Sequence, residues 1–297
     1  MDRPPAGVLV TDWVAAFASL GLVPVEEIGS GMEGTVLRLE GDLAAKVWHS
    51  AGPEELAGRQ RFYADVADVL PLRTTRMLDV VRVGERWASI EPLLHGTPMT
   101  RPLTDPHADA VADVLAALGA VTPTAAMTTL GALPGEPPLD VSAGFEEALA
   151  RLVEHRASEV LAAEVPDVSF DAVAAAVRAL PPAEPVLVHG DLIPANVLLD
   201  DAGRPSAVID FGFLTTAGDA AFDAAVTASI FDMYGAAGRT TEARLDARLG
   251  VDPRRAAVHR AAYAVVTATC FSPTGEDGHF RWCAAMLGRE DVLASLP

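Results

Sequence analysis

The sequence is poor in cysteine and in basic residues, and each scarcity excludes a class of protein. Cys270 and Cys283 are the only cysteines among 297 residues, too few for a disulfide framework or for a metal site built from CxxC motifs. The chain has 22 Lys and Arg against 41 Asp and Glu, a formal net charge of -19. This charge repels nucleic acid and anionic membranes, and we expect neither as a partner.

Long apolar runs are also missing. The longest such run, residues 261–271, is shorter than the roughly 20 residues that span a bilayer. The N-terminal segment MDRPPAGVLVTDW lacks the longer apolar stretch that a secretory signal peptide needs. We therefore expect a cytoplasmic protein, in which both thiols stay reduced.

Apolar residues are abundant, at 50% of the chain, and the length allows one large domain or two compact lobes. Alternating runs between residues 28 and 91 predict strands, with a helix over 53–69 between them. After 99 the apolar spacing becomes helical, and strand character returns only around 185–210. The pattern predicts a small, sheet-dominated lobe followed by a connector and a mainly helical lobe.

A glycine-rich string, IGSGMEGTV, joins two strand-like segments. Gly29, Gly31 and Gly34 follow GxGxxG spacing, and glycine lets a backbone turn tightly and bring its N–H groups against phosphate oxygens. A dinucleotide-binding turn has the same spacing but opens a helix, whereas TVLRLE alternates as a strand. A plain hairpin loop remains the alternative.

Lys46 lies in the next strand-like segment, LAAKVW. Alternation places it on the same face as Ala44. A lysine among apolar residues requires an anion near its ammonium group, unless it extends to solvent at a sheet edge. The glycine string that precedes it favours the anion over the sheet edge.

The strings HGDLIPAN and VIDFG carry the strongest signal. Phosphoryl transfer needs a carboxylate near the attacking hydroxyl and hard oxygen ligands for magnesium, and Asp191, Asn196 and Asp210 supply these groups. A hairpin between Asn196 and Asp210 would bring the two side chains together. Taken singly, Asp191 and Asn196 could be turn or capping residues, but the combined spacing favours a catalytic site.

Together these strings resemble the aminoglycoside phosphotransferase (APH) family, relatives of protein kinases that include choline, homoserine and methylthioribose kinases. The resemblance covers residues 28–233 in the family's order. It implies an α+β, two-lobed protein-kinase-like fold with a small antiparallel β-sheet lobe and a larger, mainly helical lobe. The expected parts are a nucleotide-binding lobe (1–91), a hinge connector (92–98) and a catalytic and substrate-binding lobe (99–297).

The resemblance also implies roles for single residues. Asp191 would be the catalytic aspartate, while Asn196 and Asp210 would bind Mg2+. The residues implied to contact the nucleotide, ATP or GTP, are the flap residues Gly29, Gly31 and Gly34, the adenine-covering Val36 and Ala44, the phosphate-binding Lys46, and the connector residues Pro92 and Leu94.

The resemblance also bears on the residues that would hold Lys46 and the catalytic loop in position. The helix glutamate that pairs with the family's lysine is missing, and Arg59 and Gln60 occupy its place, so that Gln60 or Glu55 would be the partner of Lys46. Asp219 matches a family aspartate that braces the catalytic loop.

A protein kinase is the rival within the fold. Only six residues lie between Gly212 and Asp219, too few for an activation loop with a peptide platform. Gly190 also stands where protein kinases carry an arginine that contacts a phosphorylated loop. A small-molecule acceptor follows from both observations.

The expected function is NTP- and Mg-dependent phosphorylation of a hydroxyl on a cationic small molecule, an aminoglycoside or a basic peptide antibiotic, which would confer resistance. A metabolic kinase for choline, a sugar or homoserine is the alternative. A nucleotide-binding pseudokinase is a third reading, against which the intact catalytic set argues. The carboxylates expected, as a group, to hold the cation are Asp223, Asp232, Glu242, Asp246, Glu276 and Asp277.

Overall fold

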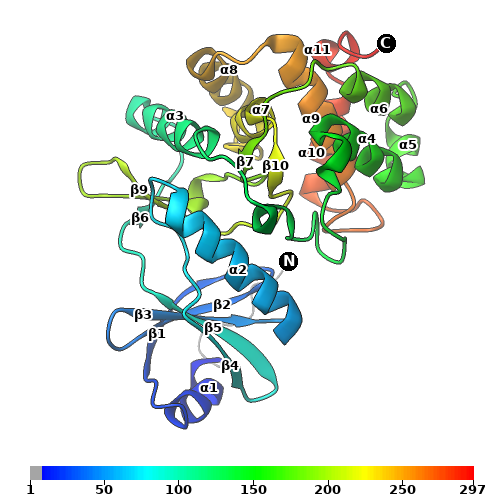
Figure 1. The fold of residues 1–297 in the computed structure, drawn as a ribbon. Helices are drawn as coiled ribbons and strands as arrows, with labels where there is room; N and C mark the ends of the chain where they lie inside the picture. Colours follow the sequence, from blue (N-terminus) through cyan, green and yellow to red (C-terminus); the bar gives the residue numbers. More distant parts are fainter. Residues whose placement is uncertain (1–8) are drawn as a thin grey trace. The chain divides into compact units, whose positions relative to one another are not determined.

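The computed structural model describes residues 9–297, and the chain forms two compact units. The first unit holds Arg73–His95 and the described residues up to Val69, and the second holds Leu70–Leu72 and Gly96–Pro297. Figure 1 shows that the first unit is built around a sheet and the second is mainly helical. The predicted α+β class is confirmed.

The first unit is built on a five-stranded sheet with the order β1-β2-β3-β5-β4, in which every neighbouring pair is antiparallel. The strands are β1 (Pro24–Ser30), β2 (Gly34–Leu39), β3 (Leu43–Trp48), β4 (Asp79–Val83) and β5 (Arg86–Pro92).

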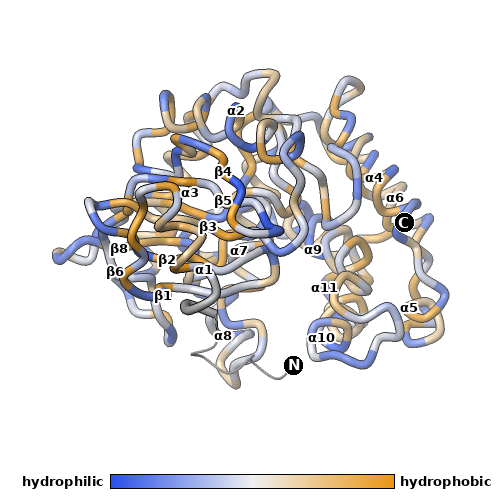
Figure 2. Tube along the Cα trace, turned by 90° about the horizontal axis from the view of Figure 1, so that it is seen from below, coloured by the Kyte–Doolittle hydropathy of each residue, from blue (hydrophilic) through white to orange (hydrophobic). Residues whose placement is uncertain are grey.

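Alternation gives this sheet two different faces. Leu37 of β2 and Val47 of β3 are fully buried and pack with Trp13 and Phe17 of α1 (Leu9–Ala18). Figure 2 shows hydrophobic segments, coloured orange, among the strands of this sheet. The opposite face of β3 carries its polar and aromatic side chains, and α2 (Pro53–Val69) begins at the predicted proline.

The second unit contains helices and two small sheets, one pairing β7 with β10 and the other ordered β6-β8-β9. Its strands are β6 (Thr97–Pro98), β7 (Val186–Val188), β8 (Val197–Leu199), β9 (Pro205–Val208) and β10 (Thr216–Gly218). Its helices are α3 (Asp105–Gly119), α4 (Phe145–Arg156), α5 (Glu159–Glu164), α6 (Phe170–Arg178), α7 (Ala220–Ile230), α8 (Gly238–Leu249), α9 (Pro253–Thr267), α10 (Gly278–Leu287) and α11 (Glu290–Leu293).

Helix α9 is the centre of the second unit. Every residue from Ala256 to Thr267 is buried, which explains why the helix has no marked polar face. The hydrophobic core around it includes Leu149 of α4, Val177 of α6, Phe222 of α7 and Leu287 of α10. Helix α7, which follows β10 along the chain, is therefore held in place by packing against this core.

Gly96 begins the second unit in a conformation that only glycine adopts readily. Its φ is 147°, and a Cβ there would lie 2.8 Å from Ser206 Oγ and 3.0 Å from Leu198 Cβ. Glycine therefore allows the chain to run directly against the β8–β9 hairpin. In the part of the chain that the structure describes, no helix is both long and apolar enough to cross a membrane.

Candidate active site

The β8–β9 hairpin places the two predicted metal ligands beside each other. Val197 pairs with Val208, and one step further the Ile209 N–H donates to the Asn196 carbonyl at 3.0 Å. Asp210 is the next residue along the chain. Asn196 and Asp210 therefore lie together at the open end of the hairpin.

Asn196 also ties this hairpin to the catalytic loop. Its Nδ2 donates to the Asp191 carbonyl at 2.9 Å, and its side chain is buried. Since the amide nitrogen is used by a carbonyl, the amide oxygen is the atom that can ligate a cation. Asn196 and Asp210 thus offer hard oxygen ligands.

This donor set fits magnesium better than a metal held wholly by protein. Mg2+ prefers oxygen ligands and is commonly bound by one or two protein groups together with phosphate oxygens and water. Within residues 9–297 no group of three or more His, Cys, Asp and Glu side chains is placed to hold a metal ion. The pair Asn196 and Asp210 is suited to a cation that arrives with a phosphate ligand.

Asp223 of α7 holds the catalytic loop through two hydrogen bonds. The backbone N–H groups of His189 and Gly190 donate to its Oδ2 and Oδ1 at 2.6 and 2.7 Å. Burial raises the pKa of Asp223 to about 6, although the two N–H donors oppose that rise. The sequence assigned the bracing role to Asp219, so the structure corrects this assignment: the brace lies one helical turn later.

Asp219 instead anchors the start of α7. Its Oδ1 accepts the Ala221 N–H at 2.9 Å, and its Oδ2 accepts from His259 Nε2 at 2.7 Å and Arg255 Nε at 2.6 Å. Burial acts to raise the pKa of Asp219, but hydrogen bonds led by that from His259 outweigh it and lower the pKa to about 2. Asp219 therefore positions the helix that carries the brace.

Thr215 holds the catalytic loop from another side. Its Oγ1 donates to the His189 carbonyl at 2.6 Å and accepts the Gly212 N–H at 2.9 Å. Sequence reasoning missed Thr215, because its role depends on two segments that meet only in the folded chain. For Asp223 a signal existed, since GDAAFDAA contains a second aspartate four positions after the first.

His189 is a neutral, structural side chain. It is fully buried, its Nδ1 accepts the Asp191 N–H at 3.3 Å, and its Nε2 faces the Ile209 carbonyl at 3.0 Å. These partners assign the proton to Nε2. Burial lowers the pKa of His189 to about 4, so it holds Asp191 in place and is a poor proton acceptor near neutral pH.

Asp191 has the titration behaviour of a general base. Burial, followed by the negative charges of Asp210 and Asp223, raises the pKa of Asp191 to about 7. A base works best when its pKa is close to the working pH. The Asp191 carboxyl can therefore accept a proton in the neutral range.

Gly190 leaves no room for the arginine of protein kinases. Its φ is +85°, and a Cβ there would lie 2.2 Å from the Phe213 carbonyl oxygen. The short segment after Gly212 returns directly into β10, where Thr216 pairs with Val188 of β7. A strand therefore occupies the place of an activation loop.

In the first unit the glycine string forms a tight turn between β1 and β2. The Gly31 N–H donates to the Gly34 carbonyl at 2.9 Å. A Cβ at Gly34 would lie 2.4 Å from the Val47 carbonyl oxygen, whereas at Gly29 and Gly31 it would meet nothing within 4 Å. Packing within the described chain therefore requires glycine at only one of the three positions.

The other residues implied to contact the nucleotide share one sheet. Val36 of β2 pairs with Lys46 of β3, and Ala44 lies two positions earlier on the same face as the lysine. Pro92 is the last residue of β5 and pairs with the first residue of β3, and Leu94 follows in the connector.

The partner of Lys46 differs from the expectation. Lys46 Nζ lies 2.7 Å from Glu33 Oε2, a carboxylate of the glycine string. Gln60 Nε2 donates instead to the Met77 carbonyl at 3.0 Å, and Glu55 pairs with Arg59. Gln60 and Glu55 were thus the wrong residues, because direct β2–β3 pairing brings the start of β2 beside the lysine.

Most of the carboxylates expected to hold a cationic acceptor already have partners. Glu242 is buried and contacts Arg289 at 2.7 Å and Arg260 at 3.3 Å. Asp246 also pairs with Arg260, and Asp223 braces the loop. These three therefore have structural roles, and the group of carboxylates expected to hold the acceptor is smaller than the sequence suggested.

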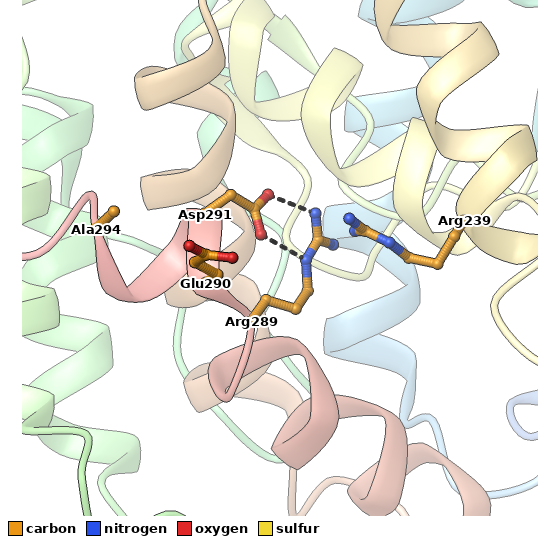
Figure 3. Close-up of a pocket in the computed structure, with 5 residues that line it drawn as sticks. All are labelled: Arg239, Arg289, Glu290, Asp291 and Ala294. Carbon is orange, nitrogen blue, oxygen red and sulfur yellow. Dashed lines mark hydrogen bonds and ion pairs between the residues drawn. The ribbon is translucent and has the colours of Figure 1, made fainter.

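In a surface pocket beside Glu242, the charges of arginine and acidic side chains also balance one another. Figure 3 shows Arg289 joined to Asp291 by two contacts, with Arg239 next to it. The pocket has a volume of about 460 Å³ and is lined by Arg239, Arg289, Glu290, Asp291 and Ala294. Because Arg289 already contacts carboxylates, the pocket offers little charge to an anion.

An exposed tyrosine, Tyr234, lies near acidic residues of the second unit. Tyr234 is 60% exposed, and the causes that raise its pKa, after burial, include Cys283, Asp277 and Asp191. Asp232 lies 3.9 Å from Arg101. Tyr234 is thus an exposed side chain close enough to Asp191 to feel its charge.

These features identify a family. The sequence matches the APH phosphotransferase enzyme family over residues 24–259. The chain belongs to this family. It is therefore an enzyme, a phosphotransferase of the kinase-like type with an alcohol group as acceptor, as the sequence predicted.

Solved structures show the same fold as this APH-family chain. Macrolide 2'-phosphotransferase MphH from Brachybacterium faecium is 24% identical, with a TM-score of 0.57 over 93% of this chain and 97% of its own. A thermostable mutant of aminoglycoside phosphotransferase APH(4)-Ia, in ternary complex with AMP-PNP and hygromycin B, is 18% identical, with a TM-score of 0.70 over 96% and 98%. A search of curated proteins gives no match. The predicted kinase-like fold is confirmed.

The brace provides a first test. In Asp223→Ala the His189 and Gly190 N–H groups lose their acceptor, which costs about 1–3 kcal/mol of unfolding free energy for each buried donor. We expect turnover to fall roughly 100-fold because the catalytic loop is displaced. Urea unfolding and steady-state kinetics measure the two effects, with exposed Asp171→Ala as control. Turnover within a few-fold of wild type would contradict the bracing role.

Asp191 links pH to both stability and rate. Its folded pKa of about 7 lies above its ordinary value of 3.8, so its ionisation destabilises the fold as pH rises toward 7 and the cost is complete above 7. We expect metal-free Asp191→Asn to melt above wild type at pH 8 and above it by a much smaller margin at pH 5, where only the first part of the cost is present. The catalytic form is the carboxylate, so kcat should fall with decreasing pH below 7. Equal melting temperatures at pH 8 would refute the raised pKa.

The glycine string makes a third test possible. We expect Gly34→Ala to lower the melting temperature, because its methyl group would collide with the β3 backbone, whereas Gly31→Ala should leave the melting temperature unchanged. If the loop amides approach phosphates, Gly31→Ala should instead weaken nucleotide binding. Calorimetry with AMP-PNP separates the two effects, and identical melting temperatures would exclude the steric account of Gly34.

Proposed function

We propose that this APH-family enzyme transfers the γ-phosphoryl group of ATP or GTP to a hydroxyl of a cationic small molecule, an aminoglycoside or a basic peptide antibiotic. Phosphorylation would inactivate the antibiotic and confer resistance. One observation carries the proposal: Asp191, with a pKa raised to about 7, is hydrogen-bonded through its carbonyl to Asn196, beside Asp210.

In this proposal Asp191 orients the acceptor hydroxyl and takes its proton. The acceptor oxygen then bonds to the γ-phosphorus as the bond to the β-phosphate oxygen breaks, and the nucleoside diphosphate leaves. Asn196 and Asp210 would hold Mg2+, which when bound neutralises charge on the phosphate oxygens. The neutral His189 and the brace Asp223 keep the Asp191 backbone fixed during the transfer.

The first unit would bind the nucleotide. Lys46 supplies an ammonium group for phosphate oxygens, and the turn at Gly29 and Gly31 has open space above it in which backbone N–H groups can meet a phosphate. Val36 and Ala44 present small apolar side chains suited to a purine. Complexes of similar folds with AMP-PNP and GDP are in line with a nucleoside triphosphate donor.

The proposed positive charge of the acceptor rests on a smaller set of carboxylates than the sequence suggested. Asp232, Glu276 and Asp277 are kept in this set, although Asp232 lies 3.9 Å from Arg101 and Asp277 accepts the Phe280 N–H. The exposed ring of Tyr234 can also face a cation. Similar folds have been solved with kanamycin and with hygromycin B, and one is named a macrolide phosphotransferase. Kanamycin and hygromycin B favour a polyamine acceptor. The macrolide phosphotransferase makes macrolides the competing class of acceptor.

The test is phosphoryl transfer from labelled ATP and GTP to a panel of aminoglycosides, basic peptide antibiotics, macrolides, choline and homoserine. We expect a polycationic antibiotic to be the best acceptor and its kcat/KM to fall as salt rises, because the screening length is only about 8 Å at physiological ionic strength. Asp210→Ala and excess chelator are the negative controls for magnesium.

Asp232→Asn tests the acceptor surface. It should raise KM for a polycation several-fold with little change in KM for nucleotide, whereas exposed Asp167→Asn should change neither. A neutral preferred acceptor, or a cationic acceptor whose kcat/KM ignores salt, would overturn the polycation proposal and favour the metabolic kinase. Nucleotide binding without transfer to any acceptor would favour a pseudokinase.

A further inference from the structure

Glu33 bridges two cations in the first unit. Its Oε2 lies 2.7 Å from Lys46 Nζ, and its Oε1 lies 2.9 Å from an Arg59 terminal nitrogen. The side chains of Lys46 and Arg59 are only 15% and 11% exposed, against 35% for Glu33. A partly buried carboxylate with both oxygens engaged fixes its partners more firmly than a surface ion pair does.

Trp48 forms a platform beneath the same two cations. Lys46 Nζ lies 4.2 Å and Arg59 Cζ 4.8 Å from the centre of its ring. The indole is buried and is held in place by its own Nε1, which donates to Ser89 Oγ at 3.1 Å. Cation–π attraction to a fixed ring restricts where each cation can lie.

The backbone of Glu33 is fixed as well. The His49 N–H donates to the Glu33 carbonyl at 2.8 Å, and His49 Nδ1 lies 3.0 Å from the Met32 carbonyl. The tip of the glycine string is therefore tied to the end of β3, the strand that carries Lys46. Glu33 reaches the lysine from a defined position.

The charges of this cluster are arranged in a specific order. Helix α2 contributes a cation, Arg59, whose pKa is raised by Glu33 and other negative groups although burial acts to lower it. A cation on α2 cannot position the Lys46 ammonium, because like charges repel. The glycine string provides the intervening carboxylate.

We propose that Glu33 is the positioning residue of Lys46 and that Arg59 acts through Glu33, so that the glycine string itself orients the lysine. The proposal builds on the nucleotide-binding role proposed above for Lys46. Lys46 has three N–H donors, so a contact with Glu33 is compatible with a contact to a phosphate oxygen. Because Glu33 belongs to the glycine string, a movement of the string over a nucleotide would also move the carboxylate that orients Lys46.

Glu33→Gln is the central variant, because it removes the charge and keeps the shape. We expect kcat/KM for the nucleotide to fall roughly 10- to 100-fold, the scale of a misplaced positioning group. The matched control is Glu26→Gln, which removes a carboxylate 2.8 Å from Arg38 in the same sheet and should change kcat/KM less than about 2-fold, as for an exposed ion pair. The control Glu26→Gln should melt close to wild type, whereas Glu33→Gln should lower the melting temperature, because Lys46 and Arg59 lose the carboxylate between them.

Arg59→Gln tests whether Arg59 acts through Glu33. Alone it should lower kcat/KM by a smaller factor than Glu33→Gln, and in the Glu33→Gln background it should have no further effect. Additive losses would show that Arg59 acts independently and would overturn that part of the proposal. Glu55→Gln, which removes the other carboxylate near Arg59, should be close to wild type.

A readout that needs no turnover separates this proposal from the proposed function. The rate of Lys46 acetylation by acetic anhydride, measured by mass spectrometry, should rise in Glu33→Gln because the carboxylate stabilises the unreactive ammonium form. If wild type transfers no phosphoryl group and Glu33→Gln still shows this rise, the proposed function fails and the contact stands. Unchanged acetylation, or tighter AMP-PNP binding by Glu33→Gln, would overturn the positioning role, the latter by showing that Glu33 competes with phosphate.

Discussion

The catalytic half of this enzyme depends on one buried carboxylate. Asp223 accepts two backbone N–H groups of the loop that carries Asp191, and Thr215 and Asn196 hold the carbonyl groups of the same loop. Because the N–H groups of His189 and Gly190 point to the same carboxylate, the following residue, Asp191, has a fixed direction. The core around α9 and the cap at Asp219 serve this arrangement by holding α7 still.

The sequence predicted those parts of the site that depend on local pattern. The strings around Asp191 and Asp210, the hairpin between them and the strand with Lys46 follow from alternation, turn residues and short spacings. The partners of these residues did not follow, because they depend on which side chains meet across elements. Asp223 was counted among the carboxylates expected to hold the acceptor, and Glu33 was overlooked because it lies inside a motif read only for its glycines.

Acidic residues in this chain occur in two kinds of electrostatic environment. Many are neutralised by arginine, as Glu242 is by Arg260 and Arg289, and these stabilise the helical unit without leaving charge for a ligand. Asp191 lies in the opposite kind of environment, since two carboxylates nearby and its burial keep its pKa high. The fold tolerates this unfavourable carboxylate because its proton affinity is what the proposed transfer requires. A net charge of -19 therefore says little about where a cation would bind.

The close approach at Gly190 also limits what this enzyme can become. A single substitution to arginine, the residue with which protein kinases sense a phosphorylated loop, would place Cβ 2.2 Å from the Phe213 carbonyl oxygen in a backbone conformation that side chains disfavour. The segment up to β10 would have to be lengthened and rerouted first. Control by phosphorylation of this loop would therefore require several changes at the same time. A series of single substitutions does not lead this enzyme to that kind of regulation.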